Sequence, residues 1–544
     1  MSRRARVRAF LADRWPLLLG AAATVGYAIL VIGFGLDFRP LHHDEGVTLN
    51  VAERPSAIDV LRTAVDVRHG PPLHYLIVHA SLAWRHDILG LRLPSAILGV
   101  VAVALAYGCG RELLGRAGGA AVAVVTAATP ITIHLAQFAR GYTAMIASAY
   151  ASLWLLLILV RTGQVRWVAP YAVAALLLVA SHPFGLFALA SELVLLVGFG
   201  LRQAVAEWRG NRRALTAASA AMVLATAAFA LLRHVYAPLE ATYNVGHGPP
   251  VVELGSSSFW SDLAGHASGY DQPLFWAVLG AAVVLGMAAL AVRNRRALIV
   301  AAVWIALPLA LLQGLTASSP DFAPERHLSF LMPGYALAVA GFALELGRLV
   351  GRRWWITAAV LGALLAPLLV ADHNDLSNFN ANLRDASLAL ASQFGPHDIL
   401  MTTAGQVGPL EDARLLGAYA VLDAPSGSSL SEWHPVDAAS RCGLIRRLGQ
   451  RRYPERVWLI ASTVQTDAVT AALRTMGAST QAFGPIVIAS APPPYTNTRS
   501  ALYLAKSMWR RAAAADPNVR DFRRMARLYR SAARKDSTGV CRFQ

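Results

Sequence analysis

Three apolar runs separated by two short polar breaks fill residues 91–160, which read LRLPSAILGVVAVALAYGCGRELLGRAGGAAVAVVTAATPITIHLAQFARGYTAMIASAYASLWLLLILV. Each run is close to the roughly 20 apolar residues that a helix needs to cross a bilayer. The breaks are RELLGR at 111–116 and QFARGY at 137–142. This stretch therefore predicts helices that cross a membrane one after another.

The composition of the whole chain agrees with this prediction. Of its 544 residues, 56% are hydrophobic and 15% are charged, and the mean hydropathy is +0.45, too apolar for a soluble protein of this length. The net charge of +17 would suit a nucleic-acid binder, but the arginines form short clusters between apolar runs. That distribution is typical of cytoplasmic loops, so we expect membrane lipids and no nucleic acid as partners.

Eleven apolar runs are long enough to be candidate spans. They cover residues 15–36, 89–109, 118–137, 142–160, 167–181, 184–201, 214–232, 273–292, 297–316, 328–346 and 354–371. Six arginine clusters lie between them, at Arg3–Arg8, Arg111–Arg116, Arg161–Arg166, Arg202–Arg213, Arg293–Arg296 and Arg348–Arg353. If all six are cytoplasmic, the N-terminus is cytoplasmic, and the odd number of spans puts the C-terminal part outside. The abundance of alanine and arginine favours a bacterial plasma membrane.

Two stretches settle the parity of the spans. The apolar residues between Arg166 and Arg202 suit two short helices that turn at Ser181-His182-Pro183-Phe184-Gly185, where proline and glycine favour a reversal. Pro71–Trp84 has 14 residues, too few to cross, and is expected to lie at the interface. Four polar segments then share the outer face: Leu41–Gly70, Gln137–Tyr142, Ser181–Pro183 and Pro320–His327.

Residues 372–544 differ from the transmembrane domain at 1–371 and predict a small extracytoplasmic α/β domain. Strands are expected at 398–403, 414–422, 456–463, 485–490 and 501–506, and helices at Ala381–Phe394 and Thr466–Met476. No glycine-rich phosphate loop is present. The basic tail, Arg510–Arg534, suits a solvated helix face or contact with anionic lipid or an acidic polymer. Cys442 and Cys541 could pair outside the cell, and the sequence leaves this open.

Two carboxylates follow the first span directly, in Leu41-His42-His43-Asp44-Glu45-Gly46. Asp44 and Glu45 beside histidines suit a base that takes a proton from a hydroxyl group. His43 and Asp44 also suit a site for a divalent cation. The alternative is helix N-capping, since acidic residues also open helices.

A second polar break carries Arg140 and Tyr142 between two spans with almost no loop. An arginine so close to hydrocarbon is costly unless it has a partner, such as an anionic lipid headgroup, or reaches water. Arg326 and His327 stand in the same way at the head of a later span.

Three further histidines lie in the outer segments. His69 follows Arg68, and together they could hold a phosphate. His74 lies on the expected interfacial helix, and His182 at the tight turn suits a cap or a pocket residue.

Together these residues resemble a known superfamily. The segments that carry the resemblance are HHDEGVTLNVA, HGPPLHYLIVHASLAW, LRLPSAILGVVAVALAYGCGRELLGR, AQFARGYTAM and PERHLSFLMPGYALAVA, in that order. They resemble the glycosyltransferase C superfamily, in particular the branch of protein O-mannosyltransferases, lipid A aminoarabinose transferases and bacterial enzymes with the dolichyl-phosphate-mannose transferase domain. The resemblance covers residues 15–371.

The resemblance implies an inverting enzyme that moves a sugar from a polyprenyl-phosphate donor to a cell-envelope acceptor on the extracytoplasmic side. It implies Asp44 as the base with Glu45 in support, and Arg140 and Arg326 as the family's two arginines, expected at the donor phosphate. His69 and Tyr142 are further candidates for binding that phosphate.

Two positions depart from the family pattern. Phe138 stands where the family usually has glutamate, and His327 replaces the usual tyrosine. The acceptor is therefore expected to differ from those of better-known members. The rival prediction is a transporter or flippase of lipid-linked sugars. The sugar and the acceptor stay open.

Overall fold

The structure is a computed structural model. It describes residues 3–33, 41–66, 71–206, 216–227, 273–316, 326–350, 378–395, 398–403, 456–463, 465–484, 486–491 and 498–516, with isolated positions between them. The chain divides into two compact units. The membrane unit is Met1–Phe38, Val51–Arg85 and Leu89–Asp375, and the second unit is Arg39–Asn50, His86–Ile88 and Leu376–Gln544.

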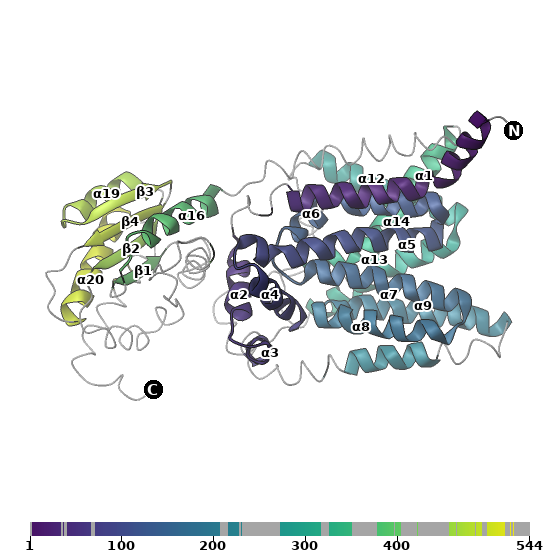
Figure 1. The fold of residues 1–544 in the computed structure, drawn as a ribbon, viewed down its shortest axis with the longest axis horizontal. Helices are drawn as coiled ribbons and strands as arrows, with labels where there is room; N and C mark the ends of the chain where they lie inside the picture. Colours follow the sequence, from purple (N-terminus) through teal and green to yellow (C-terminus); the bar gives the residue numbers. More distant parts are fainter. Residues whose placement is uncertain are drawn as a thin grey trace. The chain divides into compact units, whose positions relative to one another are not determined.

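Long apolar helices build the membrane unit and run side by side in Figure 1. They are α1 (Arg3–Ala28), continued by the π-helix η1 (Ile29–Gly33), α5 (Ile88–Ala128), α7 (Tyr142–Thr162), α8 (Val168–Ser181), α9 (Gly185–Ala206), α12 (Pro273–Arg293), α13 (Arg295–Thr316) and α14 (Met332–Leu349). Shorter elements join them: α3 (Ala57–Asp66), α4 (Leu73–Trp84), α6 (Pro130–Ala136), η2 (Val165–Trp167) and η3 (Arg326–Leu331). The helix α2 (His43–Ala52) belongs mainly to the second unit.

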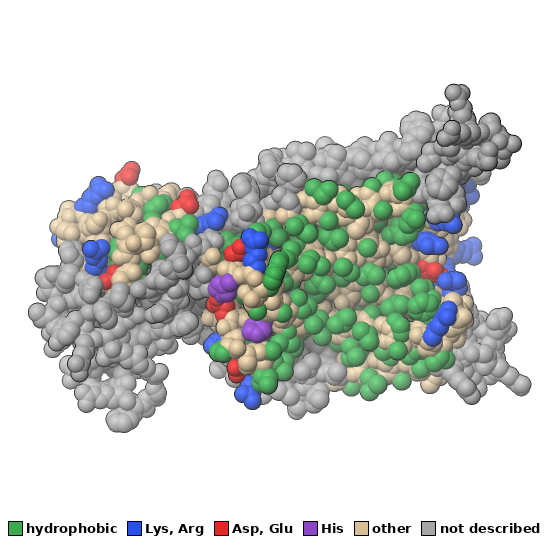
Figure 2. Space-filling view, in the orientation of Figure 1, with side chains coloured by type: hydrophobic (Ala, Val, Ile, Leu, Met, Phe, Trp, Pro, Cys, Tyr) green, Lys and Arg blue, Asp and Glu red, His purple; other side chains and the backbone are tan. Residues whose placement is uncertain are grey.

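Large apolar side chains cover the outside of this bundle, as the green flank in Figure 2 shows. Val25, Val197 and Val284 are among those that are at least half exposed. In the described residues, four helices are long and apolar enough to cross a membrane, and five more are apolar but shorter. A polytopic α-helical membrane protein, as predicted, explains this outward-facing apolar surface.

The expected spans mostly coincide with observed helices, and one is wrong in detail. Run 118–137 is interrupted after Ala128, and α6 starts at Pro130. The preceding Thr129 has extended backbone angles, as proline requires of the residue before it. The run at 354–371 lies outside the described residues, and the total of eleven spans stays a prediction.

The first polar break, RELLGR, is a reversal of the chain as expected. α5 consists of two helices joined at Gly115, which has φ +75° and ψ −173°. A Cβ on Gly110 would lie 2.8 Å from the carbonyl oxygen of Gly118, and one on Gly119 would lie 2.7 Å from that of Tyr107. The two halves therefore pack as an antiparallel hairpin, whose backbones approach closely because these positions are glycine.

Replacing Gly115 with alanine is expected to destabilise the protein through the backbone alone. The φ and ψ of this residue are accessible essentially only to glycine, and a Cβ would meet nothing within 4 Å. We expect a loss of about 1–3 kcal/mol, seen as a lower midpoint of thermal unfolding in detergent. Gly280→Ala, inside α12 and equally open, is the matched control and should keep or raise the midpoint. Equal midpoints for the two variants would contradict the conclusion that the backbone angles at Gly115 require glycine.

Polar contacts gather the ends of several helices at one end of the membrane unit. Arg161 at the end of α7 forms an ion pair with Glu112 of α5. The amide nitrogen Nδ2 of Asn294, between α12 and α13, donates to the carbonyl oxygen of Leu113 at 2.6 Å. These contacts join α5, α7, α12 and α13 at the same end.

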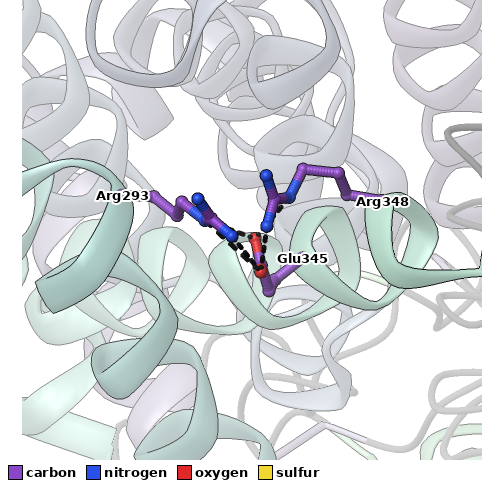
Figure 3. Close-up of polar contacts among 3 residues, drawn as sticks. All are labelled: Arg293, Glu345 and Arg348. Carbon is purple, nitrogen blue, oxygen red and sulfur yellow. Dashed lines mark hydrogen bonds and ion pairs between the residues drawn. The ribbon is translucent and has the colours of Figure 1, made fainter.

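The same end holds a small ion-pair cluster, drawn in Figure 3. Glu345 of α14 lies 3.3 Å from Arg293 of α12 and 2.9 Å from Arg348 of its own helix. Four of the six arginine clusters of the sequence, those beginning at 111, 161, 293 and 348, thus lie on one side of the bundle. This agrees with an even number of spans between neighbouring clusters. Which side of the membrane these clusters face stays a prediction.

The second unit contains a four-stranded sheet with the order β1-β2-β4-β3. Its strands are β1 (Ile399–Thr403), β2 (Val457–Ser462), β3 (Ser479–Phe483) and β4 (Ile486–Ala491), and its helices are α16 (Asn378–Ala391), α19 (Thr466–Arg474) and α20 (Thr498–Ala515). β1 is parallel to β2, and the other pairs are antiparallel. Val457, Leu459 and Val487 pack with Leu473 of α19 and Trp509 of α20, so these helices cover one face of the sheet.

Three strands stand where the sequence predicts them, at 398–403, 456–463 and 485–490, and so do both helices. β3 was not predicted. The strand expected at 501–506 is wrong, because these residues lie within α20, where Leu504, Met508 and Ala512 face the core at helical spacing. Residues 414–421, Cys442 and Cys541 lie outside the described residues.

Candidate functional site

Arg140 is held between helices of the membrane unit. It lies in the turn between α6 and α7, is half-buried, and its Nη1 donates to the hydroxyl oxygen of Tyr75 on α4 at 3.3 Å. Its carbonyl oxygen accepts from the hydroxyl of Ser95 on α5 at 3.4 Å. α4 and α5 therefore fix both the backbone and the guanidinium of Arg140. Tyr75 brings no charge of its own, so this contact serves to orient the guanidinium.

Two other outer segments meet the start of α7 at this place. A Cβ on Gly141 would lie 2.5 Å from the carbonyl oxygen of Ser181 at the end of α8, and 3.6 Å from the Cβ of His74 on α4. A side chain larger than hydrogen would push these segments apart. The structure thus brings together the QFARGY break, the Ser181 turn and the expected interfacial helix, as the parity of the spans predicts.

Aromatic rings form a continuous row along this end. The ring of Tyr142 stacks on Phe138 at 6.2 Å between centroids and lies 5.1 Å from His182. His182 in turn lies 5.1 Å from Phe184, which lies 6.3 Å from Phe330 of η3. Phe138 is buried and packs within this row.

His182 also caps its own turn, as one of the two sequence interpretations expects. Its Nδ1 accepts from the backbone N–H of Phe184 at 3.3 Å. In this tautomer its Nε2 carries the proton and is a donor.

Not all predicted residues of the membrane unit have described side chains. Arg326 and His327 begin η3, and nothing further is described of their side chains. His69 lies outside the described residues. Their roles stay predictions.

In the second unit, Asp44 and Glu45 open α2, and they differ. Glu45 is buried, and its Oε2 accepts from the backbone N–H of His42 at 2.9 Å. The N–H of Asp44 donates to Nδ1 of His42 at 3.2 Å. These reciprocal bonds form a capping box with histidine as the N-cap, so the capping alternative holds for Glu45.

Asp44 is the more accessible of the two carboxylates. It is partly exposed, and its Oδ2 lies 3.8 Å from Nδ1 of His42. The same nitrogen accepts the backbone N–H of Asp44, so His42 contacts both the backbone and the side chain of this residue. Asp44 lies in the first turn of α2, where an acidic side chain interacts favourably with the helix N-terminus.

Among the residues that the structure describes, no group of three or more histidine, cysteine, aspartate or glutamate side chains is close enough to hold a metal ion. The side chain of His43 lies outside this set. A divalent cation held by His43 and Asp44 therefore stays a prediction.

Sequence reasoning missed several residues here. Tyr75 and Ser95 gave no signal, since both are common in interfacial and apolar helices. Arg92 is fully buried, and its Nη1 donates to the carbonyl oxygen of Leu36 at 2.9 Å. As the single charged residue in run 89–109, it could have been found. The same holds for Glu192, the single charged residue in run 184–201.

Comparison with known proteins agrees with this architecture. Residues 69–232 match the family model described as dolichyl-phosphate-mannose-protein mannosyltransferase. The crystal structure of ArnT from Cupriavidus metallidurans in the apo state matches with a TM-score of 0.57 and 16% identity, covering 88% of this chain and 98% of that one. ArnT from the same organism bound to undecaprenyl phosphate matches with a TM-score of 0.55 and 15% identity, with the same coverage.

No curated protein sequence matches the chain. At 15–16% identity the likeness to ArnT shows the fold. The matched family model lies across α4 to α9, the part that holds Arg140, Tyr142 and His182. The chain is therefore a membrane protein with the ArnT fold, and its match to the mannosyltransferase model over residues 69–232 agrees with the resemblance to the glycosyltransferase C superfamily.

Proposed function

We propose that this protein is an inverting glycosyltransferase that moves a sugar from a polyprenyl-phosphate donor to a glycan, lipid or protein of the cell envelope. The observation that carries the proposal is the half-buried Arg140, whose guanidinium donates to Tyr75 of α4 and whose carbonyl oxygen accepts from Ser95 of α5. Arg140 lies within the segment that matches the mannosyltransferase model. The match to ArnT bound to undecaprenyl phosphate supports a lipid-linked donor.

The reaction would be a single displacement at the anomeric carbon. Asp44 takes the proton of the acceptor hydroxyl, and the acceptor oxygen bonds to the anomeric carbon while the bond to the phosphate oxygen breaks on the opposite face. One base is sufficient, and the polyprenyl phosphate leaves with the bonding electrons. Glu45 supports Asp44 by capping α2 and so fixes the backbone that carries it.

Negative charge grows on the departing phosphate as its bond breaks. A cation fixed beside that phosphate stabilises the transition state more than the bound donor. We assign this role to Arg140, with Arg326, His69 and Tyr142 as further residues that bind the phosphate. His74, His182 and His327 are the remaining pocket candidates in the membrane unit, and His43 is the remaining candidate in the second unit, next to Asp44.

The transporter or flippase is the second candidate. It would require ionisable residues deep between the helices, and Glu192 is such a residue. Both of its carboxylate oxygens, however, accept hydrogen bonds from other helices, from Ser152 and Tyr171. That arrangement suits a contact between helices better than a transport path.

Reconstitution separates the two candidates. The purified protein in liposomes would be given undecaprenyl-phosphate-linked sugars and envelope extracts from a deletion strain, and mass spectrometry would identify the modified acceptor. Transfer of sugar, together with its loss from the glycans of the deletion strain, supports the enzyme. Movement of the intact lipid-linked sugar across the bilayer without transfer would instead establish the transporter.

A further inference from the structure

Glu192 is fully buried in the first half of α9 and connects three helices of the membrane unit. Its Oε1 accepts from the hydroxyl of Ser152 on α7 at 2.5 Å, and its Oε2 accepts from the hydroxyl of Tyr171 on α8 at 2.8 Å. An ionisable residue inside a membrane helix is costly and points to a function by default. Each oxygen has a donor from a different helix.

The cluster of Glu192, Ser152 and Tyr171 lies too far along the helices from Arg140 to touch a donor phosphate bound there. Ser152 comes ten residues after the start of α7 at Tyr142, and Tyr171 comes ten residues before the end of α8 at Ser181. With a rise of 1.5 Å per residue, this is about 15 Å along the helices. Glu192 can therefore influence that end only through the helices it joins.

Those helices carry the candidate site at their ends. α7 begins at Tyr142, two residues after Arg140. α8 ends at Ser181, against which Gly141 packs without room for a side chain. The rings of Tyr142 and His182 pair across the same junction. A slide or rotation of α8 against α7 would separate both contacts.

Apolar side chains alone fix such a register weakly in a membrane. Lipid tails are as apolar as leucine, so the hydrophobic effect does not favour one helix register over another, whereas hydrogen bonds between helices are directional. α7, α8 and α9 pack on one another, and the two hydrogen bonds of Glu192 link each neighbour to α9.

We propose that Glu192 is a positioning residue, which through Ser152 and Tyr171 fixes the register of α7, α8 and α9 and so holds Arg140, Tyr142 and His182 in place for the polyprenyl phosphate. This inference rests on the proposed function. If Glu192 had a merely structural role, its loss would lower the overall stability of the protein. The local geometry near Arg140 and the affinity of the folded protein for the polyprenyl phosphate would stay unchanged.

Two substitutions of the full-length protein in detergent test this, with undecaprenyl phosphate as the probe. Glu192→Ala should weaken the affinity of the protein for undecaprenyl phosphate at least five-fold. It should also accelerate hydrogen–deuterium exchange in peptides 137–146 and 178–187. The affinity of Glu192→Gln should stay within two-fold of the wild type, because the glutamine amide oxygen accepts from Ser152 and its amide N–H donates to the oxygen of Tyr171. Ser191→Ala, the loss of a buried hydroxyl next to Glu192, is the matched control and should also stay within two-fold.

Unchanged exchange and affinity in Glu192→Ala would overturn the proposal, as would a Gln variant that behaves like the Ala variant. Exchange that rises equally at the other end, in peptide 293–300, would show a merely structural role and overturn it too. If Glu192→Ala does not fold, Tyr171→Phe removes one hydroxyl and keeps the ring, and should show a smaller shift of the same kind. If the wild type does not bind the probe, the proposed function fails, while the exchange measurement still decides on the register.

Discussion

Asp44→Asn is expected to abolish sugar transfer while the protein still folds and binds its donor. Loss of a general base typically lowers kcat by about 10²- to 10⁴-fold. Asparagine has the same size, and the backbone N–H of residue 44 still donates to His42, so the start of α2 should be preserved. The measurement is the rate of transfer beside the affinity for undecaprenyl phosphate, which should change less than two-fold.

Two matched variants make this result specific. Asp59→Asn changes another carboxylate in the first turn of a helix of the same outer loop, where it accepts from Ser56, and should leave the rate of transfer near that of the wild type. Glu45→Gln keeps an oxygen that can accept from His42, so it should alter transfer little. Full activity of Asp44→Asn would remove Asp44 as the base, and a large loss in Glu45→Gln would exchange the two roles.

The membrane helices could be predicted because apolar length is a strong signal. The reversal at RELLGR followed from the arginines between two runs, and Gly115 supplies the backbone angles for it. The break at Thr129–Pro130 was missed although proline gave the signal, because the run of apolar residues continues through it to Ala136. Apolar content alone does not show where a helix stops within a run.

The secondary structure of the second unit was harder to predict, because its strands and helices are short. ALYLAK at 501–506 has the residues of a strand, and only the longer window with Met508 and Ala512 reveals the helical spacing of α20. β3, at 479–483, carries polar residues on most positions and is largely exposed, so it has no apolar alternation to detect. Short elements outside the membrane depend on tertiary packing more than membrane helices do.

Part of the candidate site could be predicted because counting the membrane spans shows which loops lie on the same side of the membrane. This count predicts that the segments of Arg140 and Ser181 lie at one end, and the contact of Gly141 with Ser181 agrees. Parity does not say which side chain orients the arginine, and Tyr75 became visible only in the fold. The capping role of Glu45 likewise depends on whether its side chain turns back onto His42, which the sequence leaves open.

Arg140→Ala should weaken binding of undecaprenyl phosphate by about 10- to 100-fold, since a hydrogen bond to a charged group contributes about 1.5–3 kcal/mol and each 1.4 kcal/mol is ten-fold in affinity. The affinity of the wild type should fall with rising salt, and that of the variant should fall less, because one charge pair is lost. Isothermal titration at two salt concentrations measures both effects.

Two further variants separate orientation from charge. Arg140→Lys keeps the charge but loses the planar fork that binds two phosphate oxygens, so it should bind between the wild type and Arg140→Ala. Arg62→Ala removes an exposed arginine from α3 and should stay within two-fold, because its charge is screened by solvent. If Arg62→Ala and Arg140→Ala weaken binding equally, the phosphate responds only to net charge, and Arg140 loses its assignment as a ligand.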